Sequence, residues 1–388
     1  MTFFLVSSII KVFIVFNLIM VGVALLTLLE RRVCAWMQDR LGPNRVGPQG
    51  ILQPAADGLK NFLKEETAPA MADKTLFVLA PMVSFVPALL TFGVIPFASP
   101  LPTKWGVVPM VVADLPVGFL YILAISSLGV YGIVLAGWSS NNKYALLGGL
   151  RASAQMISYE IAMGMSTVAV LLLAGNVTLS QVIAQQQLAH AWFVVPLTLA
   201  FIIFFISALA ETNRLPFDLP EAEGELIAGY HTEYSSMKFS MFYIAEYSNM
   251  VTASALMATL FFGGWDIPFT TWDSTGEPTV LKTLLTLAAF SAKTFVFLFT
   301  YIWVRWTLPR FRYDQLMALG WKVLLPLALL YITILAAAIW FIRVRLGWDY
   351  GAGMAWALGG INLVLLIVVA WWLDRGRIVS GSVPQEAA

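Results

Sequence analysis

The chain has 388 residues, of which 59% are hydrophobic and 12% are charged. Soluble domains carry roughly 45–50% apolar and about 25% charged residues, so this composition predicts an all-α integral membrane protein. Lysines and arginines number 23 and acidic residues 22, a balance that argues against nucleic acid as the partner. One cysteine and two distant histidines offer no disulfide, iron–sulfur or other metal-ligand set. Electrons for any redox reaction must therefore come from other chains.

Nine apolar runs are long enough to cross a hydrocarbon core of roughly 30 Å. They comprise residues 3–29, 76–97, 115–138, 154–174, 192–210, 242–263, 284–306, 323–342 and 354–373. The first run has no cationic stretch ahead of it and no small-residue cleavage site, so we expect it to be retained. The sequence thus predicts one polytopic membrane domain over residues 1–388, in which 343–373 adds a C-terminal span and 374–388 forms a flexible tail.

The basic residues predict an orientation for these spans. If the N-terminus is outside, most lysines and arginines fall in inside segments, and the outside segments hold only Lys104, Lys282, Arg343 and Arg345. The positive-inside rule then places the loop 30–75 and the acidic loop 211–241 on the cytoplasmic side of the membrane.

The loop 30–75 contains an expected amphipathic helix. Its apolar residues recur at helical spacing, and charged residues lie opposite them: Ile51, Ala55, Leu59 and Phe62 against Asp57, Lys60 and Lys64. The helix is too short and too polar to span, so it should lie in the membrane interface. There it could be a simple surface anchor or a wall that an amphiphilic ligand passes.

The most polar stretch of the chain is 211–225, which holds several carboxylates and a single arginine, Arg214. Pro216 and Pro220 each remove a backbone donor, so the segment from Leu215 to Pro220 should be a loop. Grouped carboxylates near a bilayer require water, a hydrated cavity, protonation or pairing with an arginine. The alternative is an ordinary solvated acidic loop.

Five ionisable residues lie within or at the ends of the spans, namely Glu30, Glu160, Glu211, Glu246 and Lys293. Each isolated charge costs roughly 2.5–3.5 kcal/mol near a helix centre, so we expect these residues to face one another. They could lock helices together as ion pairs or form a hydrated proton path. Like charges packed together share protons, which is a requirement for coupling a redox event to proton movement.

A last polar segment, 304–315, mixes arginines with aromatic residues, a composition suited to docking another protein through Arg310 and Arg312. Arginines that snorkel at a helix end would give the same pattern.

Nine motifs, in this order, together resemble the quinone-site membrane subunits of respiratory complex I over most of the chain. They are Glu30-Arg31-Arg32 with Gln38, Arg40-Leu41-Gly42-Pro43-Asn44, Leu52-Gln53-Pro54-Ala55-Ala56-Asp57, Arg151-Ala152, Ile157-Ser158-Tyr159-Glu160, Ala210-Glu211-Thr212-Asn213-Arg214-Leu215-Pro216-Phe217-Asp218-Leu219, Glu233-Tyr234, Ala245-Glu246-Tyr247 and Pro309-Arg310-Phe311-Arg312-Tyr313-Asp314-Gln315.

The resemblance implies a membrane subunit of a proton-translocating NADH:quinone oxidoreductase (NADH dehydrogenase), without a redox centre of its own. The quinone would be the substrate, FMN and iron–sulfur clusters would lie in partner subunits, and the other membrane and peripheral subunits and membrane lipids would be the partners. The lack of a targeting segment and the added span favour a bacterial inner membrane over a mitochondrial one. We expect the added span to leave the site unaffected.

The resemblance also implies two sets of site residues. The quinone cavity would be lined by Glu30, Arg31, Arg40, Asp57, Lys60, Arg214, Phe217 and Asp218. Proton coupling would use Glu160, Glu211, Glu221, Glu223, Glu225 and Glu246. Two alternative functions remain at this point: the related subunit of a membrane-bound hydrogenase, and a stand-alone cation/proton antiporter, although we find no internal repeat of the kind that antiporters usually carry.

Overall fold

A computed structural model describes residues 2–219, 229–268, 270, 272 and 276–374. These residues form an almost entirely helical protein, as the composition predicts. The helices are α1 (Thr2–Met37), α2 (Gln53–Leu63), α3 (Lys74–Leu90), α4 (Gly118–Ser126), α5 (Leu128–Ser139), α6 (Lys143–Ala174), α7 (Leu179–Ala189), α8 (Thr198–Glu211), α9 (Ser236–Phe261), α10 (Val280–Thr307), α11 (Tyr313–Ala318), α12 (Leu325–Leu346) and α13 (Ala352–Asp374). Short 3₁₀ turns cover Pro48–Gly50 and Thr91–Val94, a π-helical turn covers Leu319–Leu324, and strands β1 (Leu101–Thr103) and β2 (Gly106–Val108) form an antiparallel hairpin.

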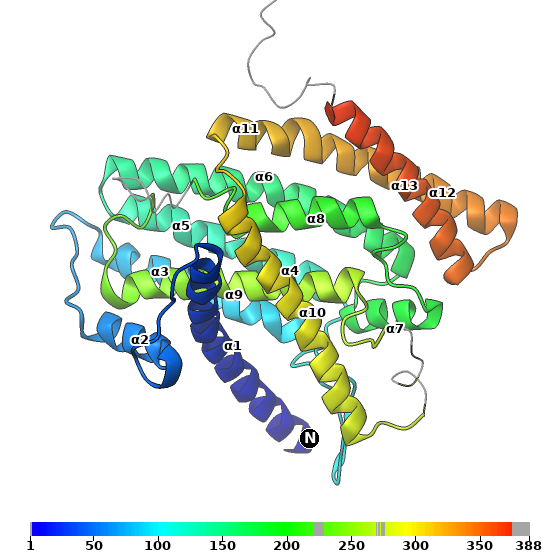
Figure 1. The fold of residues 1–388 in the computed structure, drawn as a ribbon, viewed down its shortest axis with the longest axis horizontal. Coiled ribbons are helices and arrows are strands. Elements are labelled where there is room, and N and C mark those ends of the chain that lie inside the picture. The colour runs from blue at the N-terminus through cyan, green and yellow to red at the C-terminus, as the bar shows by residue number, and fades with distance from the viewer. Residues whose placement is uncertain (1, 220–228, 269, 271, 273–275, 375–388) are drawn as a thin grey trace, which may run out of the picture.

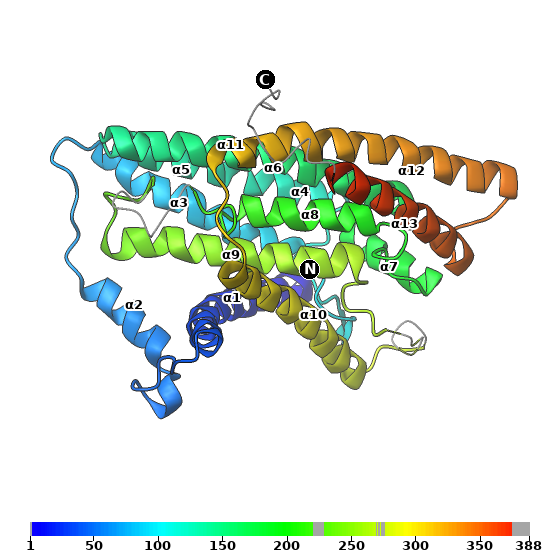
Figure 2. The same ribbon diagram turned by 45° about the horizontal axis from the view of Figure 1, so that its top comes forward.

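The long helices form a layered bundle (Figure 1). Helices α3, α5, α6, α8 and α9 run roughly along one direction, and α12 lies along the edge of the bundle (Figure 2). Helices α1 and α10 both pack against α9 at an angle to the bundle, and they diverge from each other in Figure 2. Small residues allow close packing inside the bundle, since Gly132 of α5 leaves no room for a side chain against Ala80 and Ser84 of α3.

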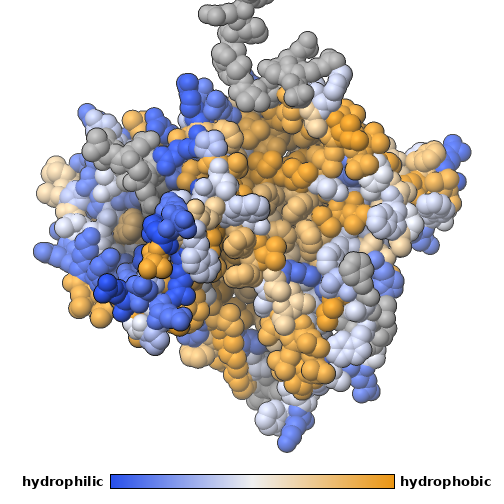
Figure 3. Space-filling view, viewed as in Figure 1, coloured by the Kyte–Doolittle hydropathy of each residue, from blue (hydrophilic) through white to orange (hydrophobic). Residues whose placement is uncertain are grey.

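The surface of the molecule is that of a membrane protein. Residues over α1, α10 and α12 are mostly hydrophobic, and hydrophilic residues gather over α2 and the neighbouring end of the bundle (Figure 3). Large apolar side chains such as Phe13, Val296 and Leu330 are more than half exposed. Because an extended surface of such side chains is costly in water, it marks a face that contacts lipid or partner helices.

Within the described residues, seven helical segments are long and apolar enough to cross a membrane: Leu5–Met37, Lys74–Val94, Gly118–Ser139, Lys143–Ala174, Val280–Thr307, Tyr313–Leu346 and Ala352–Leu373. The other two predicted runs are also largely helical. However, α8 has only 14 residues, and α9, with 26, is not among the seven. The integral membrane class is confirmed, whereas the count of nine spans stays a prediction.

Two expected boundaries differ from those in the structure. Helix α1 continues to Met37, so Glu30 lies on the helix and not in the loop predicted from residue 30. No glycine or proline interrupts the chain between Gly22 and Gly42, and charged residues with long side chains favour helix, which explains the extension. The loop predicted to end at residue 241 ends earlier, because α9 begins at Ser236. Helix α2 forms where the amphipathic pattern predicted a helix.

Candidate functional site

The segment that follows α8 is buried, although its sequence suggests an acidic surface loop. The chain leaves helical geometry after Glu211, a few residues before the loop that the prolines predict from Leu215, and Asn213 takes a left-handed conformation with a φ of 50°. Gln155 of α6 holds the turn, since its amide nitrogen Nε2 donates to the carbonyl oxygens of Ala210 and Phe217, both at 2.8 Å. The buried amide thus satisfies backbone acceptors that the helix end leaves open.

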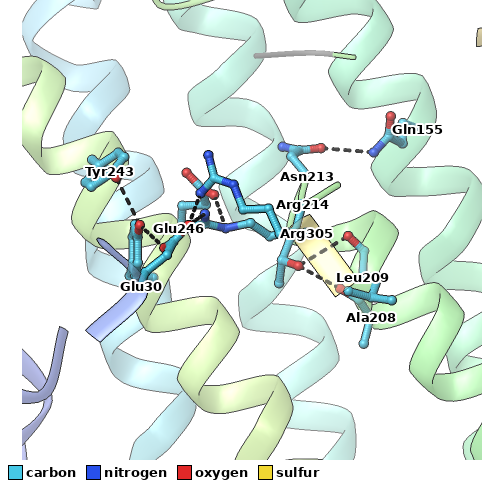
Figure 4. A network of polar contacts seen from close by, with 11 residues as sticks. Glu30, Gln155, Ala208, Leu209, Asn213, Arg214, Tyr243, Glu246 and Arg305 are labelled. Carbon is cyan, nitrogen blue, oxygen red and sulfur yellow. Dashed lines mark hydrogen bonds and ion pairs between the residues drawn. The ribbon is translucent and has the colours of Figure 1, made fainter. Parts of the chain in front are cut away.

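This turn places Arg214 among three helices (Figure 4). The arginine is 4% exposed, and its Nε lies 2.6 Å from Oε1 of Glu246 on α9. Its Nη1 lies 3.4 Å from Oε1 of Glu30 on α1. The guanidinium carbon also lies 4.2 Å from the ring centre of Tyr247, in cation–π geometry.

Glu30 is the second centre of the same group. It is 5% exposed and accepts a hydrogen bond of 2.5 Å from the hydroxyl of Tyr247. It also forms an ion pair with Arg305 of α10. The hydroxyls of Tyr243 and Tyr247 lie 2.9 Å apart, which extends the group along α9. We call these residues the ion cluster: Glu30, Arg214, Tyr243, Glu246, Tyr247 and Arg305.

The ion cluster has balanced charge, because two arginines face two glutamates. Burial lowers the pKa of Arg214, but Glu246, Tyr247 and Glu30 outweigh this effect and raise its pKa well above the usual value. The guanidinium therefore stays charged in a place where an unpaired charge would be costly.

A small polar cavity adjoins the cluster. Its volume is about 10 Å³, near the lower limit for a single water molecule. Nη2 of Arg214 is buried without a hydrogen-bond partner among the described residues, so the cavity offers it a place for a water-mediated contact. The cavity is lined by Asn213, Arg214, Leu215, Asp218, Tyr243, Glu246 and Arg305.

A second group of carboxylates lies at the end of α8, next to the ion cluster along the chain. Glu160 of α6 lies close enough to Glu211 for the two charges to repel each other, and Ser126, the last residue of α4, lies beside Glu211. The buried Tyr301 hydroxyl of α10 lies close enough to Glu211 to feel its charge. Two like charges this close favour a state in which one of the carboxyl groups carries a proton. We call Glu160 and Glu211 the carboxylate pair.

Further predicted cavity residues lie where α1 meets α2. Nη1 of Arg31 is 2.6 Å from Oδ2 of Asp57, and Oδ1 of Asp57 accepts a hydrogen bond from Gln53. Arg40 and Lys60 are exposed, and the guanidinium of Arg40 donates to Gln38 at 2.8 Å. The structure therefore brings Arg31 and Asp57 together, but it leaves Arg40 and Lys60 outside the buried groups.

Phe217 and Asp218 follow Arg214 on the buried turn. Phe217 is 3% exposed and packs against Tyr159 and Phe311, with ring centres 5.5 and 5.7 Å away. Oδ2 of Asp218 lies 3.2 Å from Nη2 of Arg310. Arg310, predicted to dock a partner, is thus engaged within this chain.

The other predicted docking residue, Arg312, has a side chain that is 79% exposed and pairs with Asp314 at 3.3 Å. The predicted coupling residues Glu221, Glu223 and Glu225 lie outside the described residues.

Lys293 does not lie with the buried glutamates, contrary to the expectation. Its ammonium group donates to the carbonyl oxygens of Phe262, Gly264 and Asp266, beyond the end of α9. There it satisfies backbone acceptors at the end of α9, where a positive charge is favourable. Arg305, twelve residues further along α10, takes the place at the carboxylates instead.

Sequence reasoning did not assign Arg305, Tyr247 or Gln155 to the site. For Arg305, the alternating direction of the spans was a usable signal. Arg305 lies at the end of the seventh run, and alternation places that end on the same side of the membrane as Glu30 and Glu246. Tyr247 directly follows Glu246, but nothing in the sequence shows that its hydroxyl turns towards α1. Gln155 gives no local signal, since its partners lie 55 and 62 residues away.

Comparison with known proteins identifies relatives of this chain. A family model described as NADH dehydrogenase matches residues 10–336. The chain is 51% identical over 335 residues to the first of two H subunits of NADH-quinone oxidoreductase from Geobacter metallireducens, an alignment that covers 86% of this chain and 96% of the relative. It is 49% identical over 336 residues to the corresponding protein of Cytophaga hutchinsonii, with 87% and 97% covered.

A third relative is the second H subunit of NADH-quinone oxidoreductase from Koribacter versatilis. It is 50% identical over 347 residues, with 86% of this chain and 97% of the relative covered. These similarities extend over the helices that build the ion cluster and the carboxylate pair, since all of them lie within residues 10–336 or begin just before them. The chain therefore belongs to the NADH dehydrogenase family of membrane proteins that includes the H subunits of NADH-quinone oxidoreductase, or complex I.

Proposed function

We propose that this chain forms the membrane part of the quinone cavity of a bacterial respiratory NADH:quinone oxidoreductase and couples quinone reduction to proton translocation. The relatives are named as quinone oxidoreductase subunits, which favours this function over a hydrogenase-related subunit or a stand-alone antiporter. The observation that carries the proposal is the position of Arg214, which bridges Glu30 and Glu246 three residues beyond Glu211.

The chemistry requires two electrons and two protons for each quinone that becomes a quinol. The electrons would come from the iron–sulfur clusters, and ultimately the FMN, of partner subunits. This chain would contribute the polar residues near the headgroup. In this proposal, the Arg31 guanidinium, half exposed beside Asp57, favours negative charge on a headgroup oxygen.

Coupling follows from competition for the arginines. Negative charge that develops on the quinone attracts Arg31 or Arg214 away from their carboxylate partners. A carboxylate that loses its cation binds a proton more readily, and a change at the ion cluster reaches the carboxylate pair through the short turn that joins Arg214 to Glu211. Proton occupancy of Glu211 and Glu160 would then follow the redox state of the quinone.

The remaining assignments follow from this role. The partners would be the other membrane subunits, the peripheral subunits that close the cavity, the quinone and membrane lipids, and the location would be a bacterial inner membrane. Arg40 and Lys60, which are exposed in the isolated chain, would contact the quinone at the mouth of the cavity only in the assembled complex.

The variant Glu211→Gln tests the proposal in membranes that contain the whole complex. NADH-driven reduction of a short-chain quinone is compared with NADH-driven reduction of a water-soluble acceptor that takes electrons upstream. We expect quinone reduction to fall several-fold and the upstream activity to persist. Glu277→Gln, at an exposed glutamate before α10, is the matched control. Equal quinone activity in Glu211→Gln and the control would refute the role of Glu211.

A further inference from the structure

Helix α13 lies beyond the residues that the family model matches, yet one of its faces is fully buried. Met354, Ala355 and Leu358 are 1%, 0% and 0% exposed. This face packs against α8 and α12 and against the residues just before α8 (Figures 1 and 2). Gly359 marks the closest approach, because a Cβ added there would lie 3.3 Å from Cγ1 and from the carbonyl oxygen of Val195.

Asn362 is the polar residue of this buried face, and it is 1% exposed. Its Nδ2 donates to the carbonyl oxygens of Pro196, at 2.5 Å, and of Leu358, at 3.1 Å. Its Oδ1 accepts hydrogen bonds from the Tyr331 hydroxyl, at 2.9 Å, and from the backbone N–H of Leu199, at 3.4 Å. The orientation of the amide is therefore fixed, since a flipped amide would set its donors against the Leu199 N–H and its acceptor against two carbonyls.

These contacts satisfy backbone groups at an unusual helix start. Helix α8 has 14 residues, or about 21 Å of length, which is less than the roughly 30 Å hydrocarbon core. The chain before it, from residue 192 to 197, is not helical, and Leu197 at the N-cap supplies no side-chain hydrogen bond. In a bilayer the open backbone groups of such a start have no water to bind. Asn362 provides a donor for the Pro196 carbonyl and an acceptor for the Leu199 N–H.

The last residue of α8 is Glu211, which lies within electrostatic range of Glu160 on α6. A helix moves as a rigid element over this length, so a displacement at Leu199 shifts Glu211 along or around the helix axis. We propose that Asn362 is a positioning residue: by holding the start of α8, it sets the place of Glu211 within the carboxylate pair. This inference rests on the proposed function for the role of Glu211. It assigns the added C-terminal span a role in the site, whereas the sequence predicted that this span leaves the site unaffected.

The test uses the complete complex in native membranes and in sealed vesicles. The variant Asn362→Leu removes all the hydrogen bonds of the amide, and Tyr331→Phe removes only the hydroxyl that donates to it. Leu363→Ala, at the next residue of α13, whose side chain is 61% exposed, is the matched control. The measurements are kcat and KM for a short-chain quinone, reduction of an upstream water-soluble acceptor, and protons moved per NADH oxidised.

We expect Asn362→Leu to lower the protons moved per NADH and the kcat several-fold, with KM and upstream reduction unchanged. Tyr331→Phe should act in the same direction with a smaller effect, and Leu363→Ala should match the unsubstituted complex. Since Asn362 acts through Glu211, the double variant with Glu211→Gln should be no worse than Glu211→Gln alone. A merely structural role for Asn362 would instead lower the amount of complex, and its effect would multiply with that of Glu211→Gln.

The outcomes separate this inference from the proposed function. If Glu211→Gln leaves quinone reduction unchanged, the proposed coupling role of Glu211 fails, and the inference about Asn362 fails with it. If Glu211→Gln impairs quinone reduction but Asn362→Leu resembles Leu363→Ala, or if the two effects multiply, only the inference is overturned. Should the Asn362→Leu complex fail to accumulate, Tyr331→Phe and its double variant with Glu211→Gln decide by the same criteria.

Discussion

Arg214 and Glu246 meet at 2.6 Å between Nε and Oε1, in a place where their side chains are only 5% and 10% exposed. One partner comes from a turn and the other from α9, so the pair joins two parts of the chain that lie well apart in the sequence. Because Arg214 also faces Glu30, the same guanidinium ties α1 to this pair. A charge that approaches any member of the ion cluster is therefore felt by all of them.

Replacing Arg214 by methionine should destabilise the complex strongly. The change leaves Glu30 with one cation fewer and Glu246 without its closest ion pair, and a broken buried pair costs about 3–5 kcal/mol. We expect Arg214→Met to reduce the amount of assembled complex in membranes and to lower its midpoint of thermal inactivation. Arg312→Met is the matched control, since the exposed pair of Arg312 with Asp314 contributes about 1 kcal/mol or less. Equal loss in both variants would contradict the buried pairing.

The hydroxyl of Tyr247 should be needed for quinone turnover and less so for assembly. It donates to Glu30 at 2.5 Å and lies 2.9 Å from the hydroxyl of Tyr243. Tyr247→Phe keeps the ring under Arg214 and removes one hydrogen bond to a charged group, a loss of about 1.5–3 kcal/mol. We expect near-normal amounts of complex and a several-fold lower kcat for short-chain quinone. Tyr131→Phe, at a tyrosine that is 63% exposed, should have no effect; a normal kcat in Tyr247→Phe would argue against a role of this hydroxyl in turnover.

The helices of the site could be predicted from the sequence, whereas the burial of its central turn could not. Apolar runs predicted the helices because a bilayer imposes a minimum length and a uniform apolar composition. Two prolines predicted a loop from Leu215 to Pro220, and the chain leaves the helix a few residues earlier, after Glu211. The burial of the same turn was not predictable, because it depends on Gln155, whose side chain satisfies carbonyls of residues far along the sequence.

Pairings between spans were the least accessible part. Glu30 finds its partners 184 and 275 residues away, at Arg214 and Arg305. A single sequence shows on which side of the membrane a residue lies, but not which helices are neighbours. The depth of a residue in the membrane, however, can be predicted from its position along a span. Lys293 and Arg305 are twelve residues apart on α10, or about 18 Å, so they could not both contact the same carboxylate.

Gln155 should control the geometry of the turn that carries Arg214. The variant Gln155→Leu has a similar volume but leaves the carbonyls of Ala210 and Phe217 without their donor, and each unsatisfied buried group costs about 1–3 kcal/mol. We expect lower thermal stability of the complex together with a several-fold fall in quinone reduction at constant upstream activity. Gln181→Leu, at an exposed glutamine of α7, serves as the control. Unchanged stability in Gln155→Leu would mean that other contacts hold the turn.

Arg31 should affect the quinone more than the fold. Its pair with Asp57 has side chains that are 48% and 25% exposed, so the pair contributes about 1 kcal/mol or less to stability. We expect Arg31→Met to leave the amount and the thermal stability of the complex unchanged and to raise the KM for short-chain quinone several-fold. Lys64→Met, at an exposed residue that follows α2, is the control for loss of one nearby positive charge. A KM equal to that of the control would place Arg31 outside the quinone site.

Lys293 should stabilise the protein without taking part in coupling. Its ammonium group binds three carbonyl oxygens just beyond α9 and lies 4.4 Å from the ring centre of Trp192. Lys293→Met keeps much of the apolar stem but leaves these acceptors without the charged donor, at a cost of about 1.5–3 kcal/mol for each charge-assisted hydrogen bond that nothing replaces. We expect a lower midpoint of thermal inactivation.

In the complex that remains, the number of protons moved per NADH oxidised should equal that of the unsubstituted complex, because the carbonyl oxygens that follow α9 hold the Lys293 ammonium group. Lys104→Met, at an exposed lysine in the β1–β2 turn, is the control for stability. If the chain were an antiporter that used Lys293 in ion transport, Lys293→Met would give the opposite result: proton movement would fall and thermal stability would stay normal.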